Sequence, residues 1–447
     1  MSASTTRLES DTAPTSTALQ TTSSADKRNT RTATPDPQPR RWRRFALLSV
    51  VGPGIIVMLA DGDAGCLITA AQSGAQWGYR LILPSLVLIP ILYIVQEMTV
   101  RLGIYSGKGH GALIRERFGR GWAALSAGPM ILSAVGTLVV EFVGVTGVGE
   151  LFGISKYITV PVATVFLIAL ALSRGYRRIE RVGIAVGLAE LAFIPAMLLA
   201  HPSLHAAASE FGSQPLGQRS YLLLLAANAG AVIMPWMLFY QQGAVVDKGL
   251  TPANLRRERQ DTFLGAVMTQ GIMISVMVLM ACTIGRTHPN APLNSVGQIS
   301  GALQRFIGHN DARILVGAGM LGGALVSALV VSVAGAWGLS EVFGWQHSLN
   351  AKPSRANAKF YASYTLAHVI GALLVLFSVD LISLAVDVEV LNALMLPIVL
   401  SFLLLLEAKT LPLAARMRGG HRFIVTGLCT VVMVLGVYIA VPTISSL

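Results

Sequence analysis

The 447-residue sequence is poor in charged residues, which make up only 13% of it. A soluble globular protein carries about 25%, and disordered chains contain few apolar residues. Here 53% of the residues are hydrophobic and the mean hydropathy is +0.63. The composition therefore excludes a soluble globular protein and a wholly disordered one, and it favours an integral membrane protein.

Cysteine is also scarce, with three scattered residues that form no paired motif: Cys66, Cys282 and Cys429. This spacing indicates neither a disulfide framework nor a zinc knuckle. The sequence lacks His-Glu-x-x-His, Gly-x-Ser-x-Gly and Walker motifs, which carry metalloprotease, serine-hydrolase and nucleotide-binding chemistry. We therefore expect neither an enzyme nor an ATP-driven pump, and no resident cofactor.

Long apolar runs recur along the chain from Phe45, each near the 20 or so residues that cross a bilayer as a helix. They do not alternate as barrel strands would. The eleven predicted spans are 45–73, 79–100, 122–148, 157–173, 182–201, 219–247, 261–284, 312–343, 358–378, 381–408 and 421–443. The sequence thus predicts an all-α integral membrane fold with eleven transmembrane helices.

The distribution of Lys and Arg between the two sides of the membrane agrees with this topology. With the N-terminus inside, the inner segments hold 28 of the 34 Lys and Arg, and the outer segments hold 6. This asymmetry is the positive-inside rule. It predicts a multi-pass protein of the cell (inner) membrane with a cytoplasmic N-terminus and an outer C-terminus. The net charge of +12 then reflects topology and contact with anionic lipid. We expect no nucleic-acid partner.

The chain divides into three predicted parts. Residues 1–44 are rich in Ser, Thr, Ala and Pro and end in four closely spaced arginines, which indicates a disordered, basic cytoplasmic tail and no secretory signal. Residues 45–410 form the predicted core, and residues 411–447 hold the eleventh helix and the C-terminus.

Two predicted spans are interrupted. The first is broken at Ala60–Gly65, and the sixth at Asn228–Ala231, just before Met234-Pro235. The two spans are five helices apart, so they run in opposite directions. Broken helices at matching places in two inverted halves mark a transporter binding site near the bilayer midplane. We therefore expect an inverted five-plus-five repeat, with halves at about 45–201 and 219–410.

Asp61 and Asp63 lie at the first interruption. A carboxylate at mid-membrane costs about 2.5–3.5 kcal/mol on insertion scales, and two neighbouring carboxylates repel each other. A bound divalent cation would relieve both penalties. The alternative is that one Asp caps a half-helix while the other is protonated or faces water.

The sixth-span interruption offers backbone carbonyls near Ala229–Ala231. Asn228 would add an amide oxygen or cap the broken helix. Met234 would add a thioether or serve as packing. Cys66 is either a further ligand or a small hydrophobic residue.

Other intramembrane acids are Glu141 in the third span and Asp387 and Glu389 in the tenth. The last two are two residues apart and cannot share a helix face, so one of them should face the cavity. His368 is expected to be a packed residue.

These features resemble the Nramp family of divalent-metal transporters. The matches, in chain order, are Gly52-Pro53-Gly54, Asp63, Gln72-Ser73-Gly74-Ala75, Gly78-Tyr79, Gln96, Arg101-Leu102-Gly103, Gly107-Lys108-Gly109, Glu141 with Gly144, Leu151-Phe152-Gly153-Ile154, Arg174-Gly175-Tyr176-Arg177 and Gly230-Ala231 with Met234-Pro235. The resemblance covers most of residues 45–410. It implies the LeuT-like broken-helix fold and, as metal ligands, the carbonyls of Ala60 and Ala231 with the side chains of Asp63 and Met234.

The sequence also departs from the family pattern. Cys66 and Ala64 replace Asn and Pro of the family's Asp-Pro-Gly-Asn motif, and Asp61 stands where an aromatic residue is usual. Trp236 replaces a His, and Leu138 replaces an acid in the third span. Both replaced groups are associated with proton movement in the family.

Asp61 and Glu389, which falls on a family Gln, make the site richer in oxygen, and oxygen ligands suit Mg²⁺ and Mn²⁺. The pattern resembles the Nramp-related magnesium transporter branch. The predicted function is uptake of divalent cations by alternating access, with Mg²⁺ preferred, Mn²⁺ also carried, no proton coupling and a monomeric carrier. The predicted metal-binding residues are Asp63, Asp61, Ala60, Ala231, Met234, Asn228 and Glu389.

Three alternatives remain. Met234 favours a proton-coupled Mn²⁺ or Fe²⁺ transporter of the ordinary family type. A sodium-coupled symporter of an organic solute has the same architecture, but two acids at the first break would repel a substrate carboxylate. A sensor or scaffold protein would bind the ion without carrying it.

Overall fold

All regular secondary structure in the described part of the computed structural model is helical. The described residues are 53–172, 185, 188–287, 291–345 and 354–444, and they all belong to one compact unit, Leu47–Leu447. The predicted tail, the start of the first span and the family matches at Gly52 and Arg174–Arg177 lie outside these residues.

Eight helical segments of the described chain are long and apolar enough to cross a bilayer. They are α3 (Ile82–Ser106), α5 (Arg120–Leu151), α10 with α11 (Arg219–Val232 and Pro235–Asp247), α12 (Leu255–Cys282), α15 (His309–Phe343), α16 (Ala358–Phe377), α17 (Leu381–Thr410) and α18 (Gly419–Ile444). The other three predicted spans correspond to α1 with α2 (Pro53–Asp61 and Ala64–Trp77), α6 (Lys156–Leu172) and η2 with α8 (Leu188–Ala192 and Phe193–Leu199). Each of the eleven predicted spans therefore contains helix in the described residues, and eight of them coincide with a helical segment long and apolar enough to cross a bilayer.

Several segments expected as loops between the spans contain short helices. They are α4 (His110–Phe118), α9 (Leu204–Phe211), η3 (Pro252–Asn254), α13 (Ile284–Thr287), α14 (Val296–Ile307) and η4 (Arg355–Asn357). Local capping explains some of them. The Ser203 side chain, for example, accepts a hydrogen bond from the N–H of Ala206 at the start of α9, which satisfies a free donor of the first turn.

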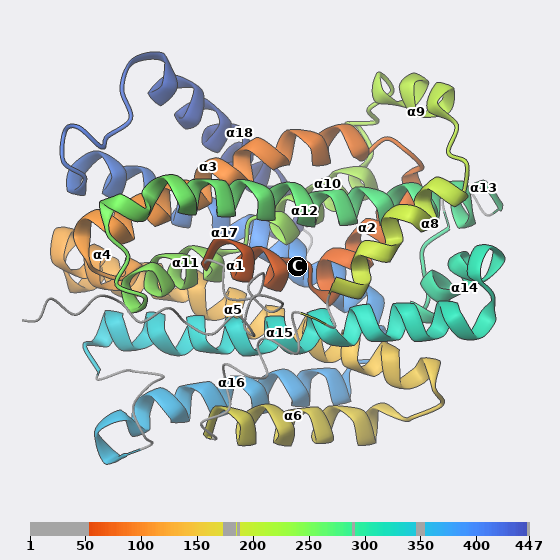
Figure 1. Ribbon diagram of the computed structural model, residues 1–447, viewed down its shortest axis with the longest axis horizontal. Helices are drawn as coiled ribbons and strands as arrows, with labels where there is room; N and C mark the ends of the chain where they lie inside the picture. The colour runs from red at the N-terminus through yellow and green to blue at the C-terminus, as the bar shows by residue number, and fades with distance from the viewer. Residues whose placement is uncertain (1–52, 173–184, 186–187, 288–290, 346–353, 445–447) are drawn as a thin grey trace, which may run out of the picture. The chain divides into compact units, whose positions relative to one another are not determined.

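The long helices pack in two groups. In one group α1 and α2 pack against α12, and α3 packs against α11 and α12; in the other, α5, α6, α15 and α16 pack against one another. Figure 1 shows α12 beside α3 and α16 beside α6. The contact of α2 with α12 is repeated five helices away by the contact of α11 with α3. This correspondence is expected for inverted halves, although their exact boundaries stay a prediction.

A close approach of α10 to α17 brings the sixth span next to Glu389. A Cβ atom at Gly230 would overlap the backbone carbonyl oxygen of Glu389 and crowd the amide nitrogen of Ala393. Only glycine allows two helix backbones to come this close. The packing of α10 on α17 therefore depends on Gly230 and sets where Glu389 lies.

The short helix α4 is held against α11 and α15. His110 Nδ1 lies 2.9 Å from Oε1 of Gln242, whose Nε2 donates to the carbonyl of Lys108 at 2.8 Å. The N–H of Gly111 donates to Glu341 Oε2 at 3.0 Å. Burial without a charged partner lowers the pKa of His110 from 6.5 to about 4. The neutral imidazole is therefore part of the docked state of α4.

We predict that Gly230→Ala destabilises the protein by roughly 1–3 kcal/mol, because the added methyl group overpacks the α10–α17 contact. The measurement is thermal unfolding of the purified protein in nanodiscs. Gly271→Ala is the matched control, since a Cβ at Gly271 on α12 meets nothing within 4 Å. An equal stability of the two variants would contradict the proposed role of the close approach.

We predict that the stabilising contribution of His110 to the docking of α4 is lost as the pH falls; it is measured in a Glu341→Gln background, because the Glu341 carboxyl also contacts α4 and can take up a proton. The folded-state pKa of His110 lies below its ordinary value of 6.5, so its contribution is fully present above about pH 6.5 and is lost as the pH falls toward 4. The full effect is on the order of 3 kcal/mol. Hydrogen exchange of residues 110–118 between pH 7.5 and 5 measures it. In His110→Gln the extra exchange at low pH should disappear; its persistence would assign the effect to another group.

Candidate metal-binding site at two helix breaks

The first break is formed by Gly62 and Asp63, between the end of α1 at Asp61 and the start of α2 at Ala64. Asp63 is the N-cap of α2, and its Oδ1 accepts a hydrogen bond from the N–H of Cys66 at 2.7 Å. A carboxylate is favourable at a helix N-terminus. Asp63 Oδ2 is buried and accepts no hydrogen bond from an amide or hydroxyl of the described residues, and the Glu141 carboxyl lies within hydrogen-bonding distance of the Asp63 carboxylate. One oxygen thus orients the side chain and leaves the other available to a cation.

The second break lies slightly later than predicted. Residues 228–231 are helical, since α10 continues to Val232, and the interruption falls at Ile233 and Met234. The prediction of a break at Asn228–Ala231 was wrong because Ala-rich sequence sustains a helix. The helix stops at Pro235, which has no N–H and forces the residue before it into extended conformation. Met234 accordingly has φ −90° and ψ 137°.

A contact between Cys66 and Ala231 joins the two breaks. The Cys66 thiol donates a hydrogen bond to the carbonyl of Ala231 at 3.2 Å. The helical donor for this carbonyl would be the N–H of residue 235, which proline lacks. The carbonyl of Ala231 is therefore free to face the first turn of α2, beside Asp63.

Five buried carboxylates surround the first break. They are Asp61, Asp63, Glu141, Glu190 and Glu389, and the exposed fraction of each is at most 3%. Asp61, Glu141, Glu190 and Glu389 all interact electrostatically with Asp63. In the described chain no Lys or Arg forms an ion pair with any of the five. Uncompensated buried charge is costly, so this region is suited to binding positive charge.

Asp61 and Glu389 also bring unpartnered carboxylate oxygens to the first break. Both oxygens of Asp61 lack a hydrogen-bond partner within the described residues, as does Glu389 Oε1. The other oxygen of Glu389 accepts from Asn392 Nδ2 at 3.0 Å. A Cβ at Gly65 would overlap Glu389 Oε1, so glycine at this position lets the carboxylate reach the first turn of α2. By contrast Asp387 is exposed, and only Glu389 faces the interior.

Met234 lies in the second break, but its sulfur already accepts hydrogen bonds. Its Sδ accepts hydrogen bonds from Trp236 Nε1 at 3.1 Å and from Thr137 Oγ1 at 3.5 Å. Both donors point at the lone pairs that a metal would use. Ligation by Met234 stays a prediction and requires these hydrogen bonds to be given up.

The remaining predicted ligands, Asn228 and Ala60, are fully buried. Asn228 Nδ2 donates to Ser73 Oγ and to the carbonyl of Leu224, both at 2.7 Å, while its Oδ1 has no partner in the described chain. Ala60 lies in the last turn of α1, whose carbonyls lack helical donors. Both residues thus retain an oxygen that is suitable for a cation.

The predicted side chains converge without forming a closed cage. Among the described residues no three His, Cys, Asp or Glu are grouped closely enough to hold a metal ion by themselves. An ion would need backbone carbonyls, water or a small rearrangement to complete its coordination.

Of the five buried carboxylates, only Glu190 was not singled out from the sequence. Its signal was present, since it is an acid within a predicted span, the same criterion that selected Glu141. His368 is packed against Phe142 and Tyr364, as predicted.

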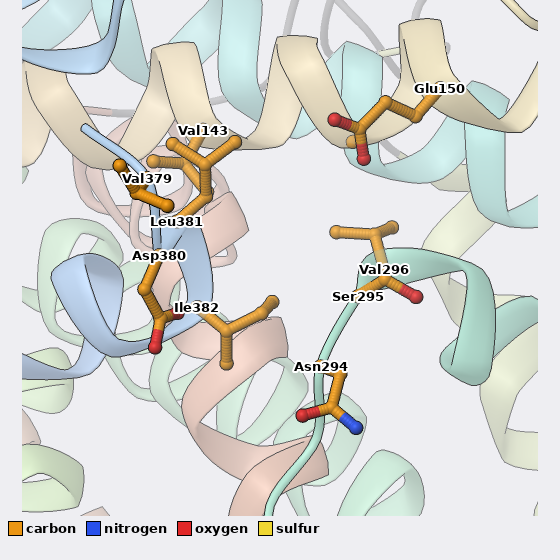
Figure 2. Close-up of a pocket in the computed structure, with 10 residues that line it drawn as sticks. Val143, Glu150, Asn294, Ser295, Val296, Val379, Asp380, Leu381 and Ile382 are labelled. Carbon is orange, nitrogen blue, oxygen red and sulfur yellow. The ribbon is translucent and has the colours of Figure 1, made fainter. Parts of the chain in front are cut away.

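A pocket of about 230 Å³ lies beside the last turns of α5 and the start of α17, the two helices that carry Glu141 and Glu389. It is bounded by the end of α5, the start of α17 and the segment that leads into α14. Figure 2 shows Glu150 on α5 and Asp380 before α17 on different sides of this pocket. The Asp380 carboxylate accepts from the N–H and hydroxyl of Ser383, at 3.0 and 2.7 Å. The candidate metal site between the two helix breaks is buried, so opening it to this pocket requires movement of the surrounding helices.

Comparisons of the sequence with known proteins identify relatives of this chain. The sequence model of the family described as natural resistance-associated macrophage protein-like, Nramp, matches residues 54–442. Divalent metal cation transporter MntH of Burkholderia ambifaria is 27% identical over 310 residues, which cover 66% of this chain and 69% of the relative. MntH of Staphylococcus aureus is 28% identical over 251 residues, 55% of this chain and 56% of the relative.

Solved structures show the same fold. A manganese transporter of Eremococcus coleocola superimposes with a TM-score of 0.71 at 18% identity, covering 90% of this chain and 87% of that one. A Na⁺-coupled sialic acid symporter has a TM-score of 0.58 at 13% identity, covering 86% and 88%. These similarities confirm the broken-helix transporter fold, and transporter relatives agree with the expectation of a protein that is not an enzyme. With the family model matching nearly the whole described chain, this protein belongs to the Nramp family.

Proposed function

We propose that this protein carries divalent metal cations across a membrane by alternating access. The observation that carries the proposal is the meeting of two oppositely directed helix breaks, joined by Cys66 and the carbonyl of Ala231, beside the Oδ2 atom of Asp63. Relatives named divalent metal cation transporters support the same substrate class.

The ion would lie between the two breaks. Asp63 Oδ2 is the principal ligand, Asp61 and Glu389 contribute charge, and the carbonyls of Ala60 and Ala231 complete the shell. Movement of α1 and α11 would open the site to either side. The pocket near Glu150 and Asp380 would then form the outer entrance. The 28 to 6 distribution of basic residues supports a cytoplasmic N-terminus in the cell membrane.

Mg²⁺ is the preferred cargo in this proposal, with Mn²⁺ also carried. A site of carboxylate and carbonyl oxygens suits hard cations, and Mg²⁺ sheds its water reluctantly, so outer carboxylates would hold it partly hydrated. The only soft predicted side chain, Met234, has its sulfur hydrogen-bonded to Trp236 and Thr137. The membrane potential, worth about 2.3 kcal/mol per charge per 100 mV, would drive entry.

A proton-coupled Mn²⁺ transporter is the rival candidate. Met234 is retained beside the breaks, and the solved neighbour from Eremococcus coleocola is named a manganese transporter. Uptake into proteoliposomes with an internal pH dye separates the two. Saturable Mg²⁺ entry without acidification supports our proposal, whereas Mn²⁺ entry with acidification and no Mg²⁺ flux supports the rival.

We predict that Asp63→Asn lowers metal uptake by about 100-fold or more, and Glu389→Gln by about tenfold, since loss of even supporting groups at metal sites costs 10–100-fold. Asp387→Asn is the matched control, because it lies on α17 two residues from Glu389 but is exposed. Initial rates of uptake in proteoliposomes check this. Wild-type rates in Asp63→Asn would exclude the assigned site.

We predict that Trp236→Phe raises the ratio of Mn²⁺ to Mg²⁺ uptake several-fold, because it frees the Met234 sulfur for softer ions. Thr137→Val, which removes the longer hydrogen bond, should have a smaller effect in the same direction. The effect should vanish when Trp236→Phe is combined with Met234→Ala. A ratio that still rises in the double variant would mean that Trp236 acts by another route than the sulfur.

A further inference from the structure

Asn392 is a buried polar residue that lies one turn after Glu389 on α17, on the same face of the helix. Its side chain is 1% exposed, and its Nδ2 donates a hydrogen bond to Glu389 Oε2 at 3.0 Å. Within the described chain no other group donates to this carboxylate. The amide of Asn392 therefore decides how the Glu389 carboxylate is turned.

Two glycines fix the rest of Glu389. Gly230 lets α10 lie against its backbone carbonyl, and Gly65 leaves room for its Oε1 at the first turn of α2. A Cβ at Gly65 would overlap Glu389 Oε1 and would stand 3.2 Å from Asp63 Oδ1, so the two carboxylates approach each other at this point. With Oε2 held by Asn392, the oxygen that reaches the first break is Oε1, which has no partner among the described residues.

The two carboxylates are oriented by different kinds of donor. Asp63 Oδ1 accepts from the backbone N–H of Cys66, a donor that a change of side chain leaves in place. Glu389 Oε2 accepts from a side chain. The identity of residue 392 can therefore alter the charge that faces the ion without changing Asp63.

The second edge of the Asn392 amide is unused. A carboxylate only accepts hydrogen bonds, so the NH₂ group must face Glu389, which leaves Oδ1 as an acceptor for another donor. Oδ1 is buried and has no partner in the part of the chain that the structure describes. A buried acceptor without a donor is costly. A water molecule bound to a metal ion is a strong donor and would satisfy it.

We propose, on the basis of the transport function proposed above, that Asn392 is a specificity-determining residue that selects a partly hydrated divalent ion. Its NH₂ group holds Glu389 so that Oε1 faces the ion. Its Oδ1 accepts a hydrogen bond from a water molecule on the ion. Both actions serve the hydration shell of the ion and leave direct ligation to Asp63 and the backbone carbonyls.

This role distinguishes Mg²⁺ from Mn²⁺. Mg²⁺ gives up water reluctantly and is usually bound with several waters in place, so acceptors in the outer shell contribute much of its affinity. Mn²⁺ exchanges its waters faster and can bind directly to the carboxylate and the carbonyls. Loss of the Asn392 amide should therefore weaken the binding of Mg²⁺ more than that of Mn²⁺.

The test compares initial rates of Mg²⁺ and Mn²⁺ uptake in proteoliposomes for wild type and Asn392→Leu, which has a similar size but no hydrogen-bonding group. We expect KM for Mg²⁺ to rise about tenfold, as for other supporting groups at metal sites. KM for Mn²⁺ and both maximal rates should change much less. Asn392→Gln keeps the amide and should restore part of the preference. Ser401→Ala, which removes an exposed hydroxyl of α17, should keep both KM values.

A double-mutant cycle tests whether Asn392 acts through Glu389. In a Glu389→Gln background, Asn392→Leu should raise KM for Mg²⁺ less than it does in the wild type, because the two residues share one contact. Thermal unfolding in nanodiscs gives a second readout that does not need transport. Asn392→Leu should remain folded and require more Mg²⁺, but not more Mn²⁺, for the same stabilisation.

The proposal is overturned if Asn392→Leu leaves KM for Mg²⁺ unchanged, if it raises KM equally for both ions, or if its effect is undiminished in Glu389→Gln. A wild type that takes up neither ion would overturn the transport function itself, and the role of Asn392 with it. The two failures are distinguishable, because the first three outcomes require a wild type that carries both ions.

Discussion

The burial of carboxylates without cationic partners is the constraint on which this structure depends. Five such groups lie around the first helix break, and the other four are within electrostatic reach of Asp63. Apolar helices cannot tolerate this charge alone. The fold tolerates it where helix ends, free carbonyls and glycine-lined spaces allow a cation to be held.

Proline and glycine create these spaces in two different ways. Pro235 removes a backbone donor, so the carbonyl of Ala231 turns to the thiol of Cys66. Gly65, Gly230 and Gly323 lack side chains at the points where acidic groups or backbones approach. Each break is thus both an interruption of hydrogen bonding and a point of close contact between helices. The same features that weaken the helices therefore assemble the ligands.

The family departures form a coherent set. Trp236 stands where the family has His, and its indole donates to the Met234 sulfur. Cys66 stands where the motif has Asn, and its thiol bridges the two breaks. Both replacements use the altered side chain for internal contacts. Hard oxygen ligands are left to bind the ion, which is the basis of the proposed preference for Mg²⁺.

The sequence by itself determined the membrane class, the positions of the long apolar helices, the family and the acids at the first break, because hydrophobic length and motif spacing are local properties. It placed the second break a few residues early, because helix propensity near Asn228 competes with the stop at Pro235. Only the tertiary structure decided which acids lie near the first break and near one another. Glu389 and Glu190 reach the first break from α17 and η2 through glycines on other helices, and such long-range approach leaves no pattern in any one segment of the chain.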